Sequence, residues 1–141
     1  MIRSLVREDY DDLVTLWEES GLSYRPMGRD SKELLQKQIE ENPDLYLGAF
    51  IDDKLIGCVL ATFDGRKGWI NRLAVSPGYR RLGIGQQLID AAEKALKKRG
   101  SSVIGVLIFD TNTPSLSLFE KMGYSIHNDI RYVSKRNSEE E

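Results

Sequence analysis

A basic, glycine-rich stretch near the middle of the chain contains residue types suited to anion binding. Its members are Arg80, Arg81, Leu82, Gly83, Ile84 and Gly85. An apolar repeat of helical period starts here and continues to Ala95, which predicts a helix that begins at these glycines. The first N–H groups of a helix have no intrahelical partner, and glycine lets a phosphate approach them closely. The stretch therefore predicts an anion site with pyrophosphate as the expected ligand, although its glycines would also suit a plain tight turn.

Two better-known phosphate-binding patterns do not fit these residues. A Walker A loop requires Gly-x-x-x-x-Gly-Lys-Ser/Thr, and the chain contains no such run. A dinucleotide fingerprint requires three glycines directly after a strand, whereas here the third glycine is absent and Gly83 lies eight positions after Val75. Neither pattern explains the stretch.

The elements that must position this stretch follow from the apolar pattern. Residues 45–51, 55–63 and 69–75 read as consecutive strands separated by turn-forming residues, which predicts an antiparallel meander. Pro77 and Gly78 end the third strand just before the predicted anion site. The glycine-rich stretch is therefore expected in the connection between a strand and a helix.

The remaining elements complete an alternating pattern of helices and strands. Helices are expected from about residue 8 to Gly21, from a capping box at Asp30-x-x-Glu33 to Asn42, and from an N-cap at Thr113 to Gly123. Further strands are expected over residues 2–7, over residues 103–109 at the centre of the sheet, and over 124–126 and 130–134 as a final hairpin. We expect one domain over residues 1–135 and an acidic polar tail over 136–141.

Two motifs together resemble a known enzyme family. The pattern Arg80-x-x-Gly83-x-Gly85, after Leu73-Ala74-Val75-x-Pro77, resembles the acetyl-CoA signature of the GNAT superfamily of N-acetyltransferases. A second block resembles that family's downstream segment: Asn112-x-x-Ser115-x-x-Leu118-Phe119-Glu120-Lys121-Met122-Gly123-Tyr124. The two blocks stand in the right order with a strand between them, and the resemblance covers nearly the whole chain. The pairs Leu16-Trp17 and Arg25-Pro26 are similar to the YpeA-like branch of that superfamily.

The resemblance implies a fold, a co-substrate and a set of binding residues. The implied fold is a three-layer α/β sandwich whose mixed sheet has about seven strands, splays between strands four and five, and is flanked by about four helices. Acetyl-CoA is the implied co-substrate, with no metal. The residues implied to bind it are Leu73, Ala74, Val75, Arg80, Arg81, Leu82, Gly83, Ile84, Gly85, Asn112 and Phe119. The implied reaction moves an acetyl group to a primary amine of a small molecule or peptide, by direct attack in a ternary complex.

The proton donor is where the chain departs from the family. The usual tyrosine position is occupied by Phe119, which has no proton to donate. A phenol, with a pKa of about 10, would suit a departing thiolate. Water, Tyr124 or Tyr132 could replace it, the thiolate could leave unassisted, or the protein could be an acyl-CoA-binding module with little turnover. The catalytic residues are therefore left unknown.

The general base and the acceptor site are equally open. Candidate bases are Glu18, Asp64, Asp110, a water held by Asn71, and His127, although each of these side chains could equally be a solvated surface group. Residues expected to contact the acceptor are Trp17, Tyr24, Arg25, Trp69 and Asn71. Arg25 and Arg29 could attract a carboxylate on the acceptor, while Tyr24 and Trp69 could enclose an apolar part of it. Alternatively, Trp17 belongs to the core and both arginines are solvated.

Composition narrows the remaining possibilities. The chain has 141 residues and a formal net charge of −2, so no global basic field favours nucleic acid. No apolar run approaches the roughly 20 residues of a membrane span, and a cytoplasmic protein is the default expectation. The single cysteine, Cys58, lies in an apolar segment and is expected to be buried rather than nucleophilic. Small-molecule or peptide amines are the expected partners, and a homodimer is left open.

Overall fold

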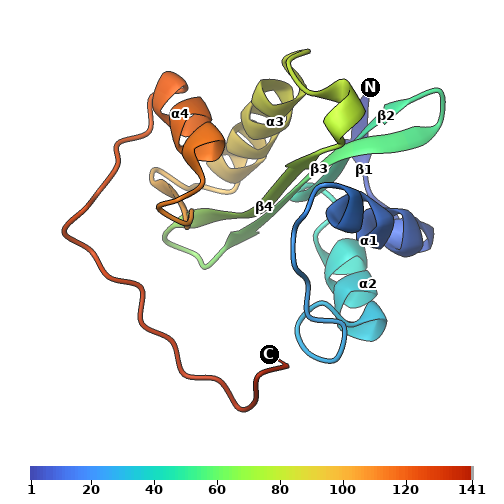
Figure 1. Ribbon diagram of the computed structural model, residues 1–141, viewed down its shortest axis with the longest axis horizontal. Helices are drawn as coiled ribbons and strands as arrows, with labels where there is room; N and C mark the ends of the chain where they lie inside the picture. The colour runs from blue at the N-terminus through green and yellow to red at the C-terminus, as the bar shows by residue number, and fades with distance from the viewer. Residues whose placement is uncertain (141) are drawn as a thin grey trace.

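The computed structural model describes residues 1–140, and Glu141 lies outside the described residues. A mixed sheet forms the centre of the molecule, with helices on both of its faces (Figure 1). Its five strands are β1 (Ile2–Ser4), β2 (Tyr46–Ile51), β3 (Lys54–Phe63), β4 (Gly68–Val75) and β5 (Ile104–Val106). The four α-helices of the described part are α1 (Tyr10–Glu19), α2 (Lys32–Glu41), α3 (Ile84–Lys98) and α4 (Thr113–Lys121). Short 3-10 turns cover Arg7–Asp9 and Pro77–Tyr79.

The strand order in the sheet follows the order along the chain, β1-β2-β3-β4-β5. Strands β1 to β4 pair antiparallel, and β5 pairs parallel to β4. The tight connection between β2 and β3 has positive φ at Asp52 and Asp53, at 50° and 62°, which is the twist that a short hairpin requires. The predicted antiparallel meander is therefore confirmed.

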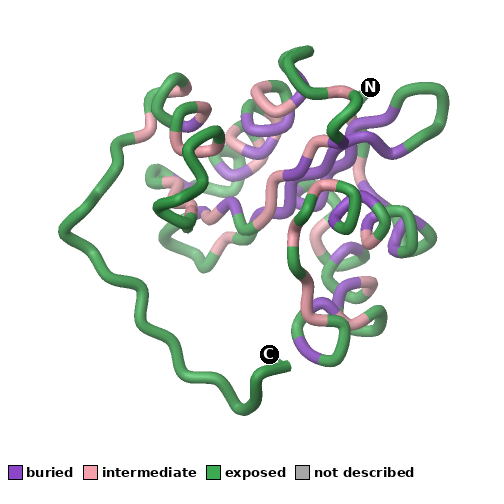
Figure 2. Tube along the Cα trace, viewed as in Figure 1, coloured by how far each residue is buried: buried purple, intermediate pink, exposed green. Residues whose placement is uncertain are grey.

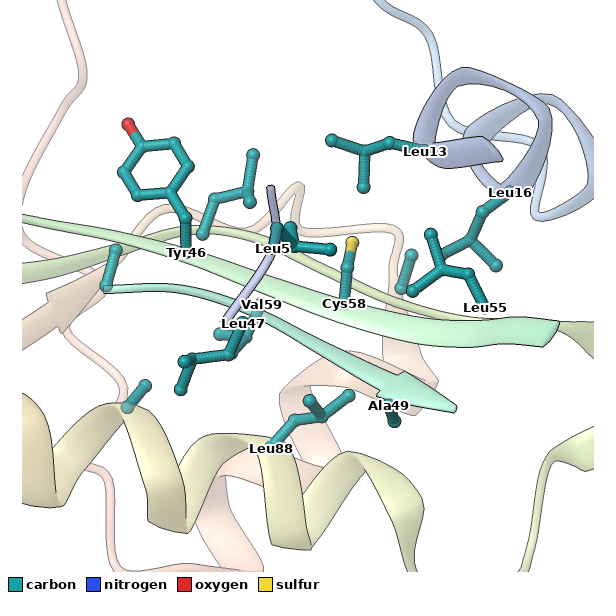
Figure 3. Close-up of a cluster of buried hydrophobic side chains, with 14 of the residues drawn as sticks. Leu5, Leu13, Leu16, Tyr46, Leu47, Ala49, Leu55, Cys58, Val59 and Leu88 are labelled. Atoms are coloured by element: carbon teal, nitrogen blue, oxygen red, sulfur yellow. The ribbon is translucent and has the colours of Figure 1, made fainter. Parts of the chain in front are cut away.

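Alternate residues of the central strand supply the two halves of the core. Cys58 of β3 points toward α1, where Leu13 and Leu16 lie, whereas Val59 points toward Leu88 of α3 (Figure 3). All five side chains are buried, and each large one stabilises the fold by about 1.5–3 kcal/mol through removal of apolar surface from water. Figure 2 shows this burial concentrated along the central strands and on the inner faces of the helices. Burial also raises the pKa of the Cys58 thiol to about 11, in agreement with a role in packing.

Strands β4 and β5 separate soon after they begin. Their pairing is limited to Gly68 with Ile104, Trp69 with Gly105 and Ile70 with Val106. β4 then continues to Val75, so its second half has β3 on one side and no ladder on the other. The predicted three-layer α/β fold, splayed between the fourth and fifth strands, is therefore confirmed.

The number of strands differs from the expectation of about seven. Residues 124–126 and 130–134 form no ladder in the described chain, and the strand expected over 103–109 is reduced to Ile104–Val106 at the edge of the sheet. Figure 1 shows the C-terminal segment running away from α4 in an extended form. Its apolar side chains are exposed, Val133 by 87 %. A hairpin with no core to cover is marginal in water, which explains why local strand propensity does not suffice here.

Two helix caps also differ from the expectation. Ser31, not Asp30, caps α2, with its Oγ accepting a hydrogen bond from the N–H of Leu34. Asn112, not Thr113, caps α4, with its Oδ1 accepting from the N–H of Ser115. In both cases the residue directly before the first helical position carries the extended or irregular backbone that an N-cap requires, so the cap lies one position later than expected in α2 and one position earlier in α4. Gly123 has φ of 95° and ends α4 as expected.

Candidate functional site

The amino end of α3 is open to an anion. Its N-cap is Gly83, with φ of 78°, so no side chain caps the helix, and its first N–H groups have no intrahelical partner. Arg81 also has a left-handed backbone, with φ of 68°. Alternation of left-handed and other conformations makes successive N–H groups converge into a concavity that binds anions. The dipole of the 15-residue helix adds positive potential at the same place.

Different structural features explain the occurrence of glycine at the two positions of this turn. Gly83 is required by its left-handed backbone, which costs other residues about 1 kcal/mol or more. Gly85 lies in a closely packed position, because a Cβ there would lie 3.3 Å from Cδ2 of Leu118 on α4 and would displace that side chain slightly. The tight-turn reading of these glycines is therefore also correct, and it coexists with the open helix end.

The second half of β4 presents main-chain groups to the opening between β4 and β5. The N–H of Ser76 bonds the carbonyl of Ile56 on β3, so by antiparallel alternation the groups of Leu73 and Val75 point away from β3. The carbonyl of Val75 accepts hydrogen bonds from Arg80 Nε at 3.2 Å and from Ser20 Oγ at 3.4 Å. Arg80 therefore lies at the mouth of this opening, beside the open end of α3, while the side chain of Ala74 is buried in the core.

The downstream block, which contains α4, packs against α3. The side chain of Asn112 is occupied in part by its cap of α4. Phe119 is buried, and its ring meets that of Tyr124 edge to face with centroids 5.0 Å apart. The Tyr124 hydroxyl donates to Glu93 Oε2 of α3 at 2.6 Å. Burial and this hydrogen bond raise the pKa of Tyr124 well above its ordinary value.

The residues expected to bind the acceptor fall into two groups. Trp17 is fully buried, with the Arg72 guanidinium 4.4 Å from its ring centroid and the ring of Tyr24 at 6.1 Å. It therefore supports these side chains rather than lining a surface. Tyr24 in turn donates to Glu18 Oε1 at 3.2 Å.

The second group lies on β4. Trp69 packs across Gly105, where a Cβ would come within 2.7 Å of its ring. Asn71 is exposed and donates through Nδ2 to Thr62 Oγ1 at 2.9 Å. These contacts hold both side chains at the end of the sheet where β4 and β5 are still paired.

Three of the candidate bases lie in a turn, in a loop or in the C-terminal segment. Asp64 accepts hydrogen bonds from the N–H groups of Lys67 and Arg66, which lower the pKa of its carboxyl and make it a weaker base. His127 is exposed in the unpaired segment after α4, and Asp110 is exposed in the loop after β5. A cavity of about 290 Å³ is lined by Arg29, Tyr132, Ser134, Lys135, Arg136 and Asn137, and by none of the residues expected to bind acetyl-CoA.

The sequence analysis missed one buried residue that lies beside the residues expected to bind the acceptor. Asp30 was expected only to cap a helix, yet its carboxylate bonds Arg72 from β4. No sequence pattern signals this pair, because its members are 42 positions apart.

Within residues 1–140 no group of acidic, cysteine or histidine side chains could hold a metal ion. No helix of this part of the chain is long and apolar enough to cross a membrane.

The fold, together with the uncapped amino end of α3, indicates the class of protein. The family model for the acetyltransferase (GNAT) family matches residues 7–124, so the chain belongs to that family. It is accordingly an acyltransferase that depends on acetyl-CoA.

Particular relatives cover nearly the whole chain. Acetyltransferase SG1711 of Sodalis glossinidius is 31% identical over 135 residues, which are 96% of this chain and 94% of the relative. The PaiA N-acetyltransferase of Thermoplasma acidophilum, solved in complex with coenzyme A, superposes with a TM-score of 0.78 at 29% identity over 90% of each chain. Ard1 of Thermoplasma volcanium has a TM-score of 0.79 at 18% identity, covering 90% of this chain and 83% of its own, and this likeness concerns the fold alone.

Proposed function

We propose that this protein transfers the acetyl group of acetyl-CoA to a primary amine of a small molecule or peptide, by direct attack within a ternary complex. The observation that carries the proposal is the uncapped amino end of α3 at the mouth of the opening between β4 and β5. Bound acetyl-CoA would supply the thioester carbonyl that the neutral amine attacks and the thiolate that leaves.

The chain's own residues bind and orient the co-substrate. The N–H groups of Gly83, Ile84 and Gly85 would hold the pyrophosphate, assisted by the cationic side chains of Arg80 and Arg81. Leu82 joins the two parts of this turn. Arg80, whose Nε donates to the carbonyl of Val75, already lies beside this helix end.

The main chain of β4 would position the reactive end. Leu73 and Val75 would offer main-chain groups that form no ladder with β5 to an extended ligand, in the manner of an added strand. A main-chain N–H in the segment Leu73 to Val75 would also stabilise the negative charge that develops on the carbonyl oxygen. Asn112 and Phe119 would border the same arm from the side of α4.

The acceptor would approach from the side of Trp69, Asn71 and Tyr24. Asn71 is exposed and could orient a water molecule that takes the amine proton, while Tyr24 and Arg25 would contact the rest of the acceptor.

A cytoplasmic location and a homodimer are further proposals. Sedimentation velocity at several protein concentrations tests whether the protein is a homodimer.

One observation favours a second function, an acyl-CoA-binding module with little turnover. The position of the family's acid is Phe119, which is buried against Tyr124, and the Tyr124 hydroxyl is bound to Glu93. Neither side chain offers a proton to a leaving thiolate in this arrangement.

A titration of acetyl-CoA by calorimetry, run beside a thiol-release assay with a panel of amines, separates the two functions. The proposed enzyme binds acetyl-CoA and releases thiol only when an amine is present, over many turnovers. Binding without amine-dependent release across the panel would identify the module instead. Failure to bind acetyl-CoA would refute both.

A further inference from the structure

Asp30 is a buried carboxylate that the proposed reaction does not use. The residue is 6 % exposed. Its Oδ2 accepts hydrogen bonds from the main-chain N–H of Arg25 at 2.7 Å and from Arg72 Nη2 at 3.2 Å. A buried charge is tolerated only where it is paired and hydrogen-bonded, so these two contacts hold the carboxylate in one position.

The main chain of Asp30 fastens the same segment from two further directions. Its N–H donates to the carbonyl of Arg25 at 3.0 Å, which closes residues 25–30 into a compact loop. Its carbonyl accepts from the Tyr10 hydroxyl of α1 at 2.8 Å. One residue thus ties the loop to itself, to α1 and, through Arg72, to β4.

The contact with β4 lies beside the groups that the proposed function assigns to the co-substrate. Arg72 directly precedes Leu73, whose main-chain groups face the opening between β4 and β5. The Arg72 guanidinium is itself held over the ring of fully buried Trp17, 4.4 Å from the centroid. Both ends of the Asp30–Arg72 pair are therefore anchored in the core rather than on a mobile surface.

We propose that Asp30 is a positioning residue, which holds the loop of residues 22–31 against β4 so that Tyr24 and Arg25 meet the acceptor amine at a fixed distance from the thioester. This inference rests on the proposed function. Asp30 is too deeply buried to touch the acceptor, so its influence passes through the main chain of Arg25. Loss of the contacts of Asp30 with Arg25 and Arg72 is expected to weaken acceptor binding and leave acetyl-CoA binding unaltered.

The chain contains a matched control at the start of α1. Asp9 is 7 % exposed, and its Oδ2 also accepts from one main-chain N–H, that of Val6 at 2.8 Å, and from one arginine, Arg3 at 3.0 Å. Arg3 lies over an aromatic ring, 3.8 Å from the centroid of Phe50, as Arg72 lies over Trp17. Asp9 has the same chemistry as Asp30, but its partners belong to the first residues of the chain.

The experiment compares Asp30→Asn with Asp9→Asn in the full chain. Amide hydrogen exchange of residues 22–31 should become about tenfold faster or more in the first variant and stay unchanged in the second, since a charge-assisted hydrogen bond is lost in the loop. With an amine that the parent protein acetylates, the kcat/KM for that amine should fall about tenfold in Asp30→Asn, mainly through KM, and less than twofold in Asp9→Asn. Calorimetric affinity for acetyl-CoA should match the parent in both.

A second variant removes the partner instead. Arg72→Gln should reproduce the effects of Asp30→Asn on exchange and on the acceptor KM, and the double variant should be no worse than either single one, because the two side chains act as a unit. If the exchange rates are equal in Asp30→Asn, Arg72→Gln and the parent, the Asp30–Arg72 pair does not hold the loop of residues 22–31. Faster exchange with an unchanged acceptor KM would overturn its role in acceptor binding. Absence of turnover by the parent protein would count against the proposed function and this role together, while the exchange rates would still decide whether Asp30 holds the loop.

Discussion

The hydroxyl of Tyr124 and the carboxylate of Glu93 form a 2.6 Å hydrogen bond that joins the segment following α4 to the middle of α3. Tyr124 directly contacts Phe119, the position that a tyrosine occupies in the family pattern. A phenol whose pKa is raised by burial and by a neighbouring carboxylate gives up its proton less readily than a free one. The relationship therefore argues for a structural role of Tyr124 and against its use as the acid.

We expect Tyr124→Phe to keep the acetyl-transfer rate of the parent within about twofold and to lower the free energy of unfolding by about 1 kcal/mol, the typical net value of one hydrogen bond. Steady-state kinetics and urea denaturation measure the two effects. A Glu93→Gln variant serves as the control, because it weakens the same bond from the side of α3. A large loss of kcat in Tyr124→Phe alone would show that the hydroxyl turns to the thiol during the reaction.

Phe119→Tyr tests whether a missing proton donor limits turnover. We expect the rate of thiol release to rise, by up to about a hundredfold, because a positioned general acid contributes factors of that order. Phe119→Leu is the control, since it changes the packing against Tyr124 without adding a donor. Equal rates for Phe119→Tyr and the parent would mean that the thiolate leaves unassisted or that another group already serves.

Gly83 offers a charge test of the anion site. Gly83→Asn and Gly83→Asp share the strain of a left-handed backbone and have nearly the same size, but only aspartate places a negative charge at the open end of α3. We expect Gly83→Asp to bind acetyl-CoA about tenfold more weakly than Gly83→Asn, because like charges about 4 Å apart cost about 1–4 kcal/mol near a protein surface. Calorimetry measures both affinities. Aspartate should meanwhile stabilise the helix end, so equal or tighter binding by Gly83→Asp would place the diphosphate elsewhere.

The ion pair of Asp44 with Arg99 predicts a dependence of stability on pH. Arg99 reaches the carboxylate through Nε at 2.8 Å and Nη2 at 2.6 Å, and this contact lowers the pKa of Asp44. A depressed folded-state pKa stabilises the protein above the unfolded pKa of about 3.9, and this stabilisation is lost as the pH falls through the folded value.

Replacing Asp44 with asparagine should therefore lower the free energy of unfolding at pH 7 by about 0.2–1 kcal/mol, since both side chains are partly exposed. The difference should shrink in high salt and vanish at low pH, where the parent carboxyl is protonated. Urea denaturation of both proteins across this pH range provides the measurement. A difference that persisted at the lowest pH would assign the effect to packing or backbone contacts instead.

Much of the fold could be predicted because its signals are local. The helical apolar repeat that begins at Gly83, the turn residues Asp52 and Asp53, and the apolar runs of β2 to β4 each act within a few positions. The structure bears out the corresponding elements, including the helix end at Gly123. For the same reason the uncapped start of α3 could be predicted from the sequence, since a helix terminus and its glycines are contiguous.

Contacts between distant residues were decided only by the tertiary structure. The Asp30 carboxylate bonds Arg72 rather than capping a helix, Trp17 is fully buried beneath that pair, and residues 130–134 find no partner strand. Each outcome depends on which surfaces meet after the sheet and helices pack, and this is information that neither periodicity nor turn chemistry carries. The sequence by itself therefore determined the family and the order of the central strands, and it predicts where the proposed anion site lies. Only the packed structure determined how the loop of residues 22–31 is held, because the Asp30–Arg72 contact joins residues that are far apart along the chain.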